Sequence, residues 1–164
     1  MRGTWPTIWL MTDERMGDSL VAALRRVPPG GGVVFRHLAT ARRERVALFR
    51  RVRGLAVARR LVLVAGGDRL PWAARHGGPA PTTAAAHDRR EAVAGVRRGA
   101  RVLFVSPVFA TRTHPGLRGL GVRAARQVIC GLPIAAIALG GMDARRWRRM
   151  RAMDGWAGID AWLA

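Results

Sequence analysis

The sequence predicts an α/β protein built from repeated βα units. Short apolar runs that begin or end at turn residues alternate with longer arginine-rich stretches, and this alternation is typical of strands connected by helices. Most of the apolar runs are continuous, which is the pattern of parallel strands covered on both faces. The chain has 164 residues, enough for one sizeable core but short for two domains. We therefore expect a single domain over residues 1–164.

Seven apolar runs in the chain are expected to form the strands. Each is five or six residues long. Residues 68–81 hold only a short helical piece and a Gly/Pro-rich turn where another strand and helix would fit, so one βα unit is expected to be shortened or missing. The seven expected strands are residues 7–12, 32–36, 61–65, 83–87, 101–106, 134–139 and 155–159.

Five stretches between these runs have helical composition, with apolar residues at spacings of three and four. Asp88 and Asp143 are placed as N-caps, and Glu91 follows Asp88 by three residues in a pattern that resembles a capping box. The chain stops shortly after the last expected strand, so the closing helix is expected to be shortened or missing. The expected helices are residues 19–26, 41–60, 88–98, 122–130 and 143–153.

Arginine dominates the charge of the chain, because all 29 basic residues are arginine and the formal net charge is +19. Such a charge suits a polyanion, but arginine also fills solvated helix faces. We expect the second situation, and no nucleic-acid partner. The single cysteine, Cys130, is expected in the core and fits a reducing compartment. No apolar run approaches the roughly 18 residues of a membrane helix, so we expect a cytoplasmic protein without a membrane partner.

The stretch from Ser106 to Gly116 directly follows an expected strand and is rich in hydroxyl and cationic side chains. Loops in this position carry the active sites of barrel enzymes. We therefore take Thr111, Thr113 and His114 as candidates that line a pocket.

A second candidate is the strand end at Gly140 and Gly141, which precedes the helix expected from Asp143. Glycines at such a turn let a phosphate approach the backbone amides at a helix N-terminus, where the helix dipole favours an anion. A purely structural turn would have the same sequence, so this pattern alone leaves both interpretations open.

His87 stands at the end of the fourth expected strand. A neutral imidazole whose pKa is near neutrality is suited to moving a proton. Capping of the following helix is the alternative role for this residue.

The chain resembles the thiamine phosphate synthase and TenI superfamily, most clearly in its last third. Residues 106–116 are similar to the GPxFxTxTK loop of that superfamily, with Thr111 and Thr113 at its threonines and His114 in place of its lysine. Residues 137–142 resemble its IGGM turn.

Three further segments extend the resemblance. Residues 154–160 are similar to the DGxAxxS segment, with Asp160 in place of the serine, and a carboxylate there repels a phosphate unless an arginine or a metal intervenes. Arg36 matches the arginine of a QLRxK strand, and His87 and Glu91 match SxHxxxE.

The resemblance implies a reduced TIM-type (β/α) barrel with about seven recognisable parallel strands. It also implies that the amides at Gly140, Gly141, Gly158 and Ile159 hold a phosphate. Arg36 would neutralise a phosphate or carboxylate oxygen, and His87 would be the catalytic acid and base.

The implied function is a TenI-like enzyme that binds a small phosphorylated thiazole and shifts a proton, with no cofactor and no bound metal. The first alternative is a thiamine phosphate synthase, which joins a pyrimidine pyrophosphate to the thiazole phosphate and requires Mg²⁺. The second alternative is a degenerate barrel that serves as a binding or regulatory protein. A homodimer that covers the gap in the barrel is a further expectation.

Overall fold

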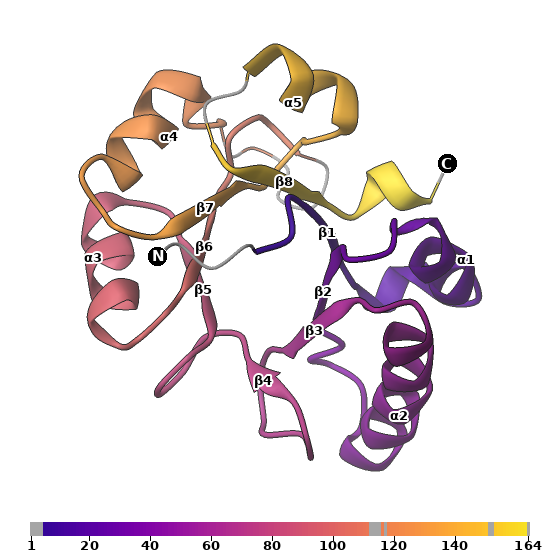
Figure 1. The fold of residues 1–164 in the computed structure, drawn as a ribbon. Helices are drawn as coiled ribbons and strands as arrows, with labels where there is room; N and C mark the ends of the chain where they lie inside the picture. The colour runs from indigo at the N-terminus through magenta and orange to yellow at the C-terminus, as the bar shows by residue number, and fades with distance from the viewer. Residues whose placement is uncertain (1–4, 112–115, 117, 151–152, 164) are drawn as a thin grey trace.

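Eight parallel strands curve into a barrel in the computed structural model, which describes residues 5–111, 116, 118–150 and 153–163 (Figure 1). Hydrogen-bonded neighbours follow the order β4-β3-β2-β1-β8-β7-β6-β5. A single bridge between His76 and Thr83 joins the two ends of this order. The strands are β1 (Ile8–Met11), β2 (Gly32–Phe35), β3 (Val62–Ala65), β4 (Ala74–Arg75), β5 (Thr83–Ala86), β6 (Val102–Val105), β7 (Ala135–Ala138) and β8 (Gly155–Gly158).

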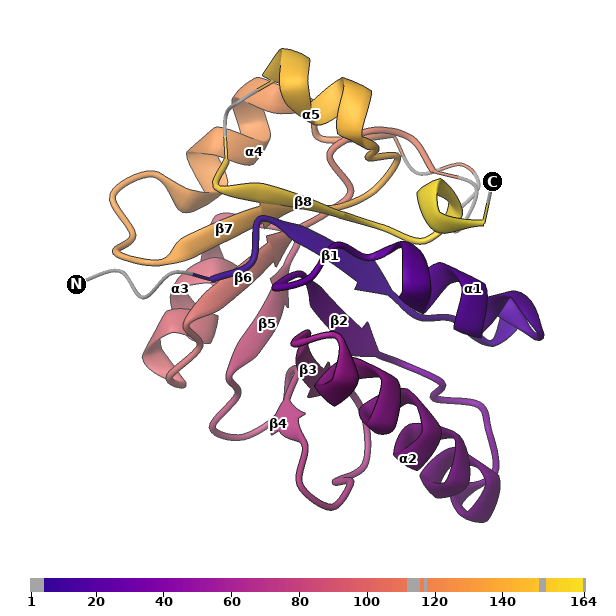
Figure 2. The same ribbon diagram turned by 45° about the vertical axis from the view of Figure 1, so that its right-hand side comes forward.

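Helices cover most of the outside of the barrel, but not all of it (Figures 1 and 2). The β3–β4 and β4–β5 connections are fully described and contain no helix. The ring of helices is therefore open beside β4, between α2 and α3. The helical elements are η1 (Glu14–Met16), α1 (Ser19–Arg26), α2 (Arg42–Ala58), α3 (Arg89–Arg97), α4 (Gly121–Ile129), α5 (Ala144–Met150) and η2 (Asp160–Trp162).

The structure adds one strand, β4, to the seven that the sequence predicts. β4 has two residues, which pair with Val64 and Ala65 of β3. A strand of two residues leaves no apolar run in the sequence. This explains why the sequence predicted a gap where the structure has a strand. The helices on either side of β4 are what this part of the barrel lacks.

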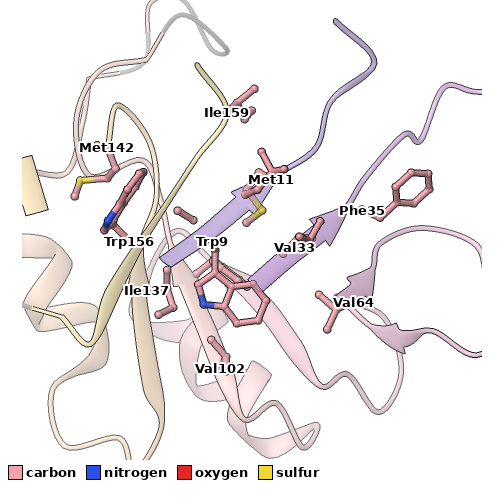
Figure 3. Packing of buried hydrophobic residues seen from close by; sticks show 14 of the residues in the cluster. Trp9, Met11, Val33, Phe35, Val64, Val102, Ile137, Met142, Trp156 and Ile159 are labelled. Carbon is pink, nitrogen blue, oxygen red and sulfur yellow. The ribbon is translucent and has the colours of Figure 1, made fainter. Parts of the chain in front are cut away.

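Trp9 fills the barrel interior away from the carboxyl ends of the strands. Its side chain is completely buried, and Figure 3 shows the indole in the middle of the barrel. A Cβ atom on Gly32 of the neighbouring strand would lie 2.1 Å from the indole ring. The ring also packs edge-to-face against Phe104, with 5.2 Å between the ring centroids. A large residue beside a glycine thus closes one end of the barrel and leaves the other end open for a site.

The short helix η2 covers the position of the expected closing helix. Trp162 stacks on Trp156 of β8, with ring centroids 5.4 Å apart, and its indole Nε1 donates to the carbonyl oxygen of Trp9 at 3.3 Å. Arg26 of α1 donates to the Trp162 carbonyl at 2.8 Å. These contacts hold η2 against β8, β1 and α1.

The expected helix caps are confirmed. Asp88 accepts from the Glu91 amide and Asp143 accepts from the Arg146 amide, both at 2.7 Å. The expectation for Cys130 is wrong, because its side chain is exposed at the end of α4. None of the helices in the described residues is long and apolar enough to span a membrane.

Candidate active site

A cavity of about 320 Å³ lies at the carboxyl ends of the barrel strands. Side chains two residues apart on a strand share a face, and inward-facing positions at the ends of seven strands line this cavity. These positions are Met11, Arg36, His76, Ala85, His87, Ser106, Leu139 and Ile159. The location is the one that barrel enzymes use for catalysis.

The turn after β7 contributes Gly140 and Gly141 to the cavity wall. Both have positive φ, at 92° and 59°. A Cβ atom on Gly140 would lie 2.7 Å from Cα of Pro107, and one on Gly141 would lie 2.6 Å from the carbonyl oxygen of Ala110. Packing and backbone conformation therefore require glycine here, whatever the turn binds.

The end of β8 lies beside this turn, because β7 and β8 are paired neighbours. Gly158, Ile159 and Asp160 line the same cavity. The four expected phosphate-binding residues are thus brought together at one side of the site. Asp160 places a carboxylate among them.

Arg36 lines the cavity from the end of β2 and is held by three hydrogen bonds to the two residues that follow β1, Thr12 and Asp13. Its backbone amide donates to Thr12 Oγ1 at 3.0 Å, and its Nε and Nη2 donate to the Thr12 carbonyl and Asp13 Oδ2, both at 3.2 Å. Burial acts to raise the pKa of Asp13. Hydrogen bonds from Arg15 and the charges of both arginines outweigh burial, so that pKa lies below its usual value.

His87 lines the cavity from the end of β5, as the sequence predicts. Its Nδ1 lies 2.8 Å from Glu91 Oε2, and its backbone amide donates to the same oxygen at 2.9 Å. These bonds lower the pKa of Glu91. The carboxylate of Glu91 accepts a hydrogen bond from the Nδ1–H group of His87, so the neutral imidazole has its lone pair on Nε2. This arrangement is suited to a base.

His76 is a cavity residue that the sequence reasoning missed. Its Nδ1 lies 2.9 Å from Thr83 Oγ1, and its ring packs edge-to-face on Phe104 at 5.5 Å between centroids. Burial, with a smaller effect of the Arg36 charge, lowers its pKa to about 4. The imidazole is therefore neutral at pH 7. No pattern announces this residue, because β4 is too short to show which of its side chains face inward.

Thr111 is the remaining expected cavity residue that the structure places, and it lines the cavity. Thr113 and His114 lie outside the described residues. No group of three or more His, Cys, Asp and Glu side chains in the described parts of the chain is arranged to hold a metal ion.

Comparison with known families identifies the class of this chain. A family model for thiamine monophosphate synthase (TMP-TENI) matches residues 74–161, which is more than half of the chain. The chain therefore belongs to the thiamine phosphate synthase and TenI family. Comparison with curated proteins gives no match.

Two solved structures share the fold of this chain. Thiamine phosphate pyrophosphorylase from Pyrococcus furiosus has a TM-score of 0.78 and 21% identity, over 96% of this chain and 88% of that one. A structure described as native KDPGal has a TM-score of 0.60 and 13% identity, over 95% and 83%. At these low identities the structural likeness shows the barrel fold alone, and the reaction has to be argued from the site.

Proposed function

We propose that the chain is an enzyme of the thiamine phosphate synthase type, which binds a thiazole phosphate in the cavity and joins it to a pyrimidine pyrophosphate. The family match and the likeness to the Pyrococcus pyrophosphorylase support this reading better than the TenI-like activity expected from the sequence. The observation that carries the proposal is that the turns after β7 and β8 and the Arg36 guanidinium line one cavity.

In this proposal the amides of the two turns hold the phosphate, and Arg36 supplies a positive charge to the ligand. Backbone amides and guanidinium groups both bind phosphate oxygens, and a guanidinium can donate two parallel hydrogen bonds. The Asp13 contact keeps the guanidinium in place before a ligand arrives. Apolar side chains, including Met11, Leu139 and Met142, provide a wall against which a heterocycle can pack.

The resemblance implies Mg²⁺ for a synthase, and the described part of the cavity fits that ion poorly. Mg²⁺ binds carboxylate oxygens together with substrate phosphates. Asp160 is the one carboxylate among the described residues that line the cavity. Both oxygens of Asp13 accept hydrogen bonds from arginines. The proposal therefore assigns no step to a metal, and Mg²⁺ enters the assay as a variable.

The second candidate function is the TenI-like proton shift, and the His87–Glu91 contact favours it. The contact fixes the tautomer that leaves a basic Nε2 on a residue that lines the cavity. The synthase proposal above assigns no step to such a base. The two functions therefore differ in whether turnover requires His87.

The test measures binding of thiazole phosphate by calorimetry, and turnover with pyrimidine pyrophosphate in the presence and absence of Mg²⁺. A synthase forms thiamine phosphate and keeps most of its turnover in His87→Ala. A tautomerase converts the thiazole isomer alone and loses that activity in His87→Ala, while binding persists. If neither substrate bound, both functions would be contradicted. The remaining alternative would then be a barrel without catalytic activity.

Binding to the cavity is tested separately with Arg36→Ala. Loss of a charge-assisted hydrogen bond of about 1.5–3 kcal/mol weakens binding about tenfold or more. Arg43→Ala removes the same charge from an exposed position on α2 and is the matched control. Equal affinities of the two variants would contradict the assigned role of Arg36.

A further inference from the structure

Trp72 occupies a turn position that suits glycine. The turn spans Leu70 to Ala73, with the Ala73 amide donating to the Leu70 carbonyl at 3.4 Å and Pro71 at its second position. Trp72 at the third position has φ of 58°. Turns with proline second and a positive φ third favour Gly or Asn at that third position. A bulky side chain there strains the backbone.

Burial of the side chain does not offset this strain. Trp72 is 74% exposed, whereas Trp9, Trp156 and Trp162 are each at most 7% exposed. The fold thus holds a large aromatic ring on its surface, in an unfavourable backbone conformation, with little packing in return. Strain of this kind is concentrated at sites that bind ligands or partners.

An exposed arginine lies beside the indole, and a second lies one turn from it on α2. The guanidinium carbon of Arg53 is 5.6 Å from the Trp72 ring centroid. Arg50 precedes Arg53 by three positions, and Val57, which is 66% exposed, follows it by four, so all three are neighbours on the surface of α2. The ion pairs present among the described residues involve neither arginine. We call Arg50, Arg53, Val57 and Trp72 the Trp72 patch.

The missing helix keeps the Trp72 patch accessible. The β3–β4 connection, which carries Trp72, lies beside α2 where the ring of helices is open (Figure 1). In a complete barrel a helix in this connection would pack next to α2. Here a short loop with an exposed indole stands in its place.

We propose that the Trp72 patch binds single-stranded RNA, with a base stacked on Trp72 and phosphates paired with Arg50 and Arg53. Aromatic platforms beside cationic side chains are the general means by which proteins hold single strands. The net charge of +19 favours a polyanion over a second copy of this chain. This proposal replaces the expectation from the sequence that no nucleic acid binds, because the structure exposes Trp72 beside Arg53. The Trp72 patch lies outside the cavity, so the proposal does not depend on the proposed enzyme function.

The first test is fluorescence anisotropy of a labelled 12-residue oligouridylate at 0.15 M salt, with the wild-type chain and Trp72→Gly. Loss of the stacked base is expected to weaken binding about tenfold. Glycine relieves the positive φ, so the melting temperature is expected to stay the same or rise. Trp72→Asn, which also tolerates this conformation, is the second variant and is expected to behave alike.

A charge-matched pair separates the Trp72 patch from general attraction. Arg50→Gln with Arg53→Gln removes two charges from the patch, and Arg97→Gln with Arg98→Gln removes two exposed charges at the end of α3. The first pair is expected to weaken binding at least fivefold more than the second, and to lower the slope of log K against log salt by about 1.4.

Four outcomes would overturn the proposal. They are no binding at 0.15 M salt, unchanged affinity in Trp72→Gly, equal effects of the two arginine pairs, or a melting temperature several degrees lower in both Trp72 variants. The last result would make Trp72 a structural residue. If polyglutamate displaced the labelled oligonucleotide as well as unlabelled oligouridylate does, the result would instead indicate a partner with an acidic protein surface.

Discussion

Two histidines line the cavity in contrasting surroundings, and the contrast divides their roles. His87 faces Glu91 at an exposed position, with 59% of its side chain accessible. His76 lies inside the barrel between Thr83 and Phe104, where burial lowers its pKa to about 4. The Nε2 of His87 is accessible to a ligand in the cavity, whereas His76 offers a neutral hydrogen-bonding group.

The low pKa of His76 predicts a loss of stability in acid. Its pKa is about 4 in the folded chain and near 6.5 when unfolded. Between these values the unfolded chain binds more protons, so the free energy of unfolding falls as the pH drops from about 6.5 to 4. The loss from this residue is expected to reach about 3 kcal/mol at most. Urea unfolding across this pH range measures it.

The wild-type chain is the reference for this prediction. His76→Gln is expected to flatten the pH dependence of stability between about pH 6.5 and 4. Burial also lowers the pKa of His37 and adds a loss in the same direction. The variant keeps His37, so the difference between its slope and that of the wild type isolates His76. Equal slopes in the two chains would contradict the assignment.

The sequence predicted cavity residues where a motif surrounds them along the chain, and it missed a cavity residue that lies outside any motif. His87, Gly140 and Gly141 were predicted from their neighbours along the chain, and all three line the cavity. His76 has no such neighbours, because its position follows a strand of two residues and its role depends on burial by Phe104. A contact between residues far apart in sequence has no local signal.

Helix caps on this chain differ in a way that permits a matched comparison at the scale of one element. Asp88 begins α3 and its side chain accepts from the Glu91 amide. Asp18 is the N-cap of α1 but makes no such bond. Asp88→Ala is expected to lower the free energy of unfolding by about 1 kcal/mol, and Asp18→Ala by much less. Urea unfolding of both variants at pH 7 checks this, and equal losses would count against the capping bond.

The elements themselves were largely predictable, because periodicity and caps are local. The five α-helices of the described residues and seven of the eight strands lie where the apolar patterns place them, and each end falls within three residues of the expected end. β4 was not predictable, since its pairing with β3 is fixed by the barrel rather than by its own residues. The open helix ring beside β4 follows from the same short segment, and it is what exposes Trp72.

At the scale of the whole molecule, charge opposes the compact state. The chain has 29 arginines and 10 acidic residues, so most arginines face other arginines and water rather than carboxylates. Confining like charges in one small molecule raises the free energy of the folded state. Salt screens charges over a Debye length of about 10 Å at 0.1 M and about 3 Å at 1 M. The fold is therefore expected to gain stability from salt.

The prediction is a rise in melting temperature of several degrees between 0.05 M and 0.5 M NaCl. A separate rise in about 1 mM phosphate, which hardly changes the ionic strength, would report binding in the cavity. The two effects can be distinguished with Arg36→Ala, which removes a cavity charge but leaves the other 28 arginines. This variant should keep the response to NaCl and lose the response to phosphate. A melting temperature that falls with NaCl would contradict the prediction, because it would mean that attraction between opposite charges outweighs repulsion. The described residues form few ion pairs, namely Arg15–Asp13, Arg36–Asp13 and His87–Glu91.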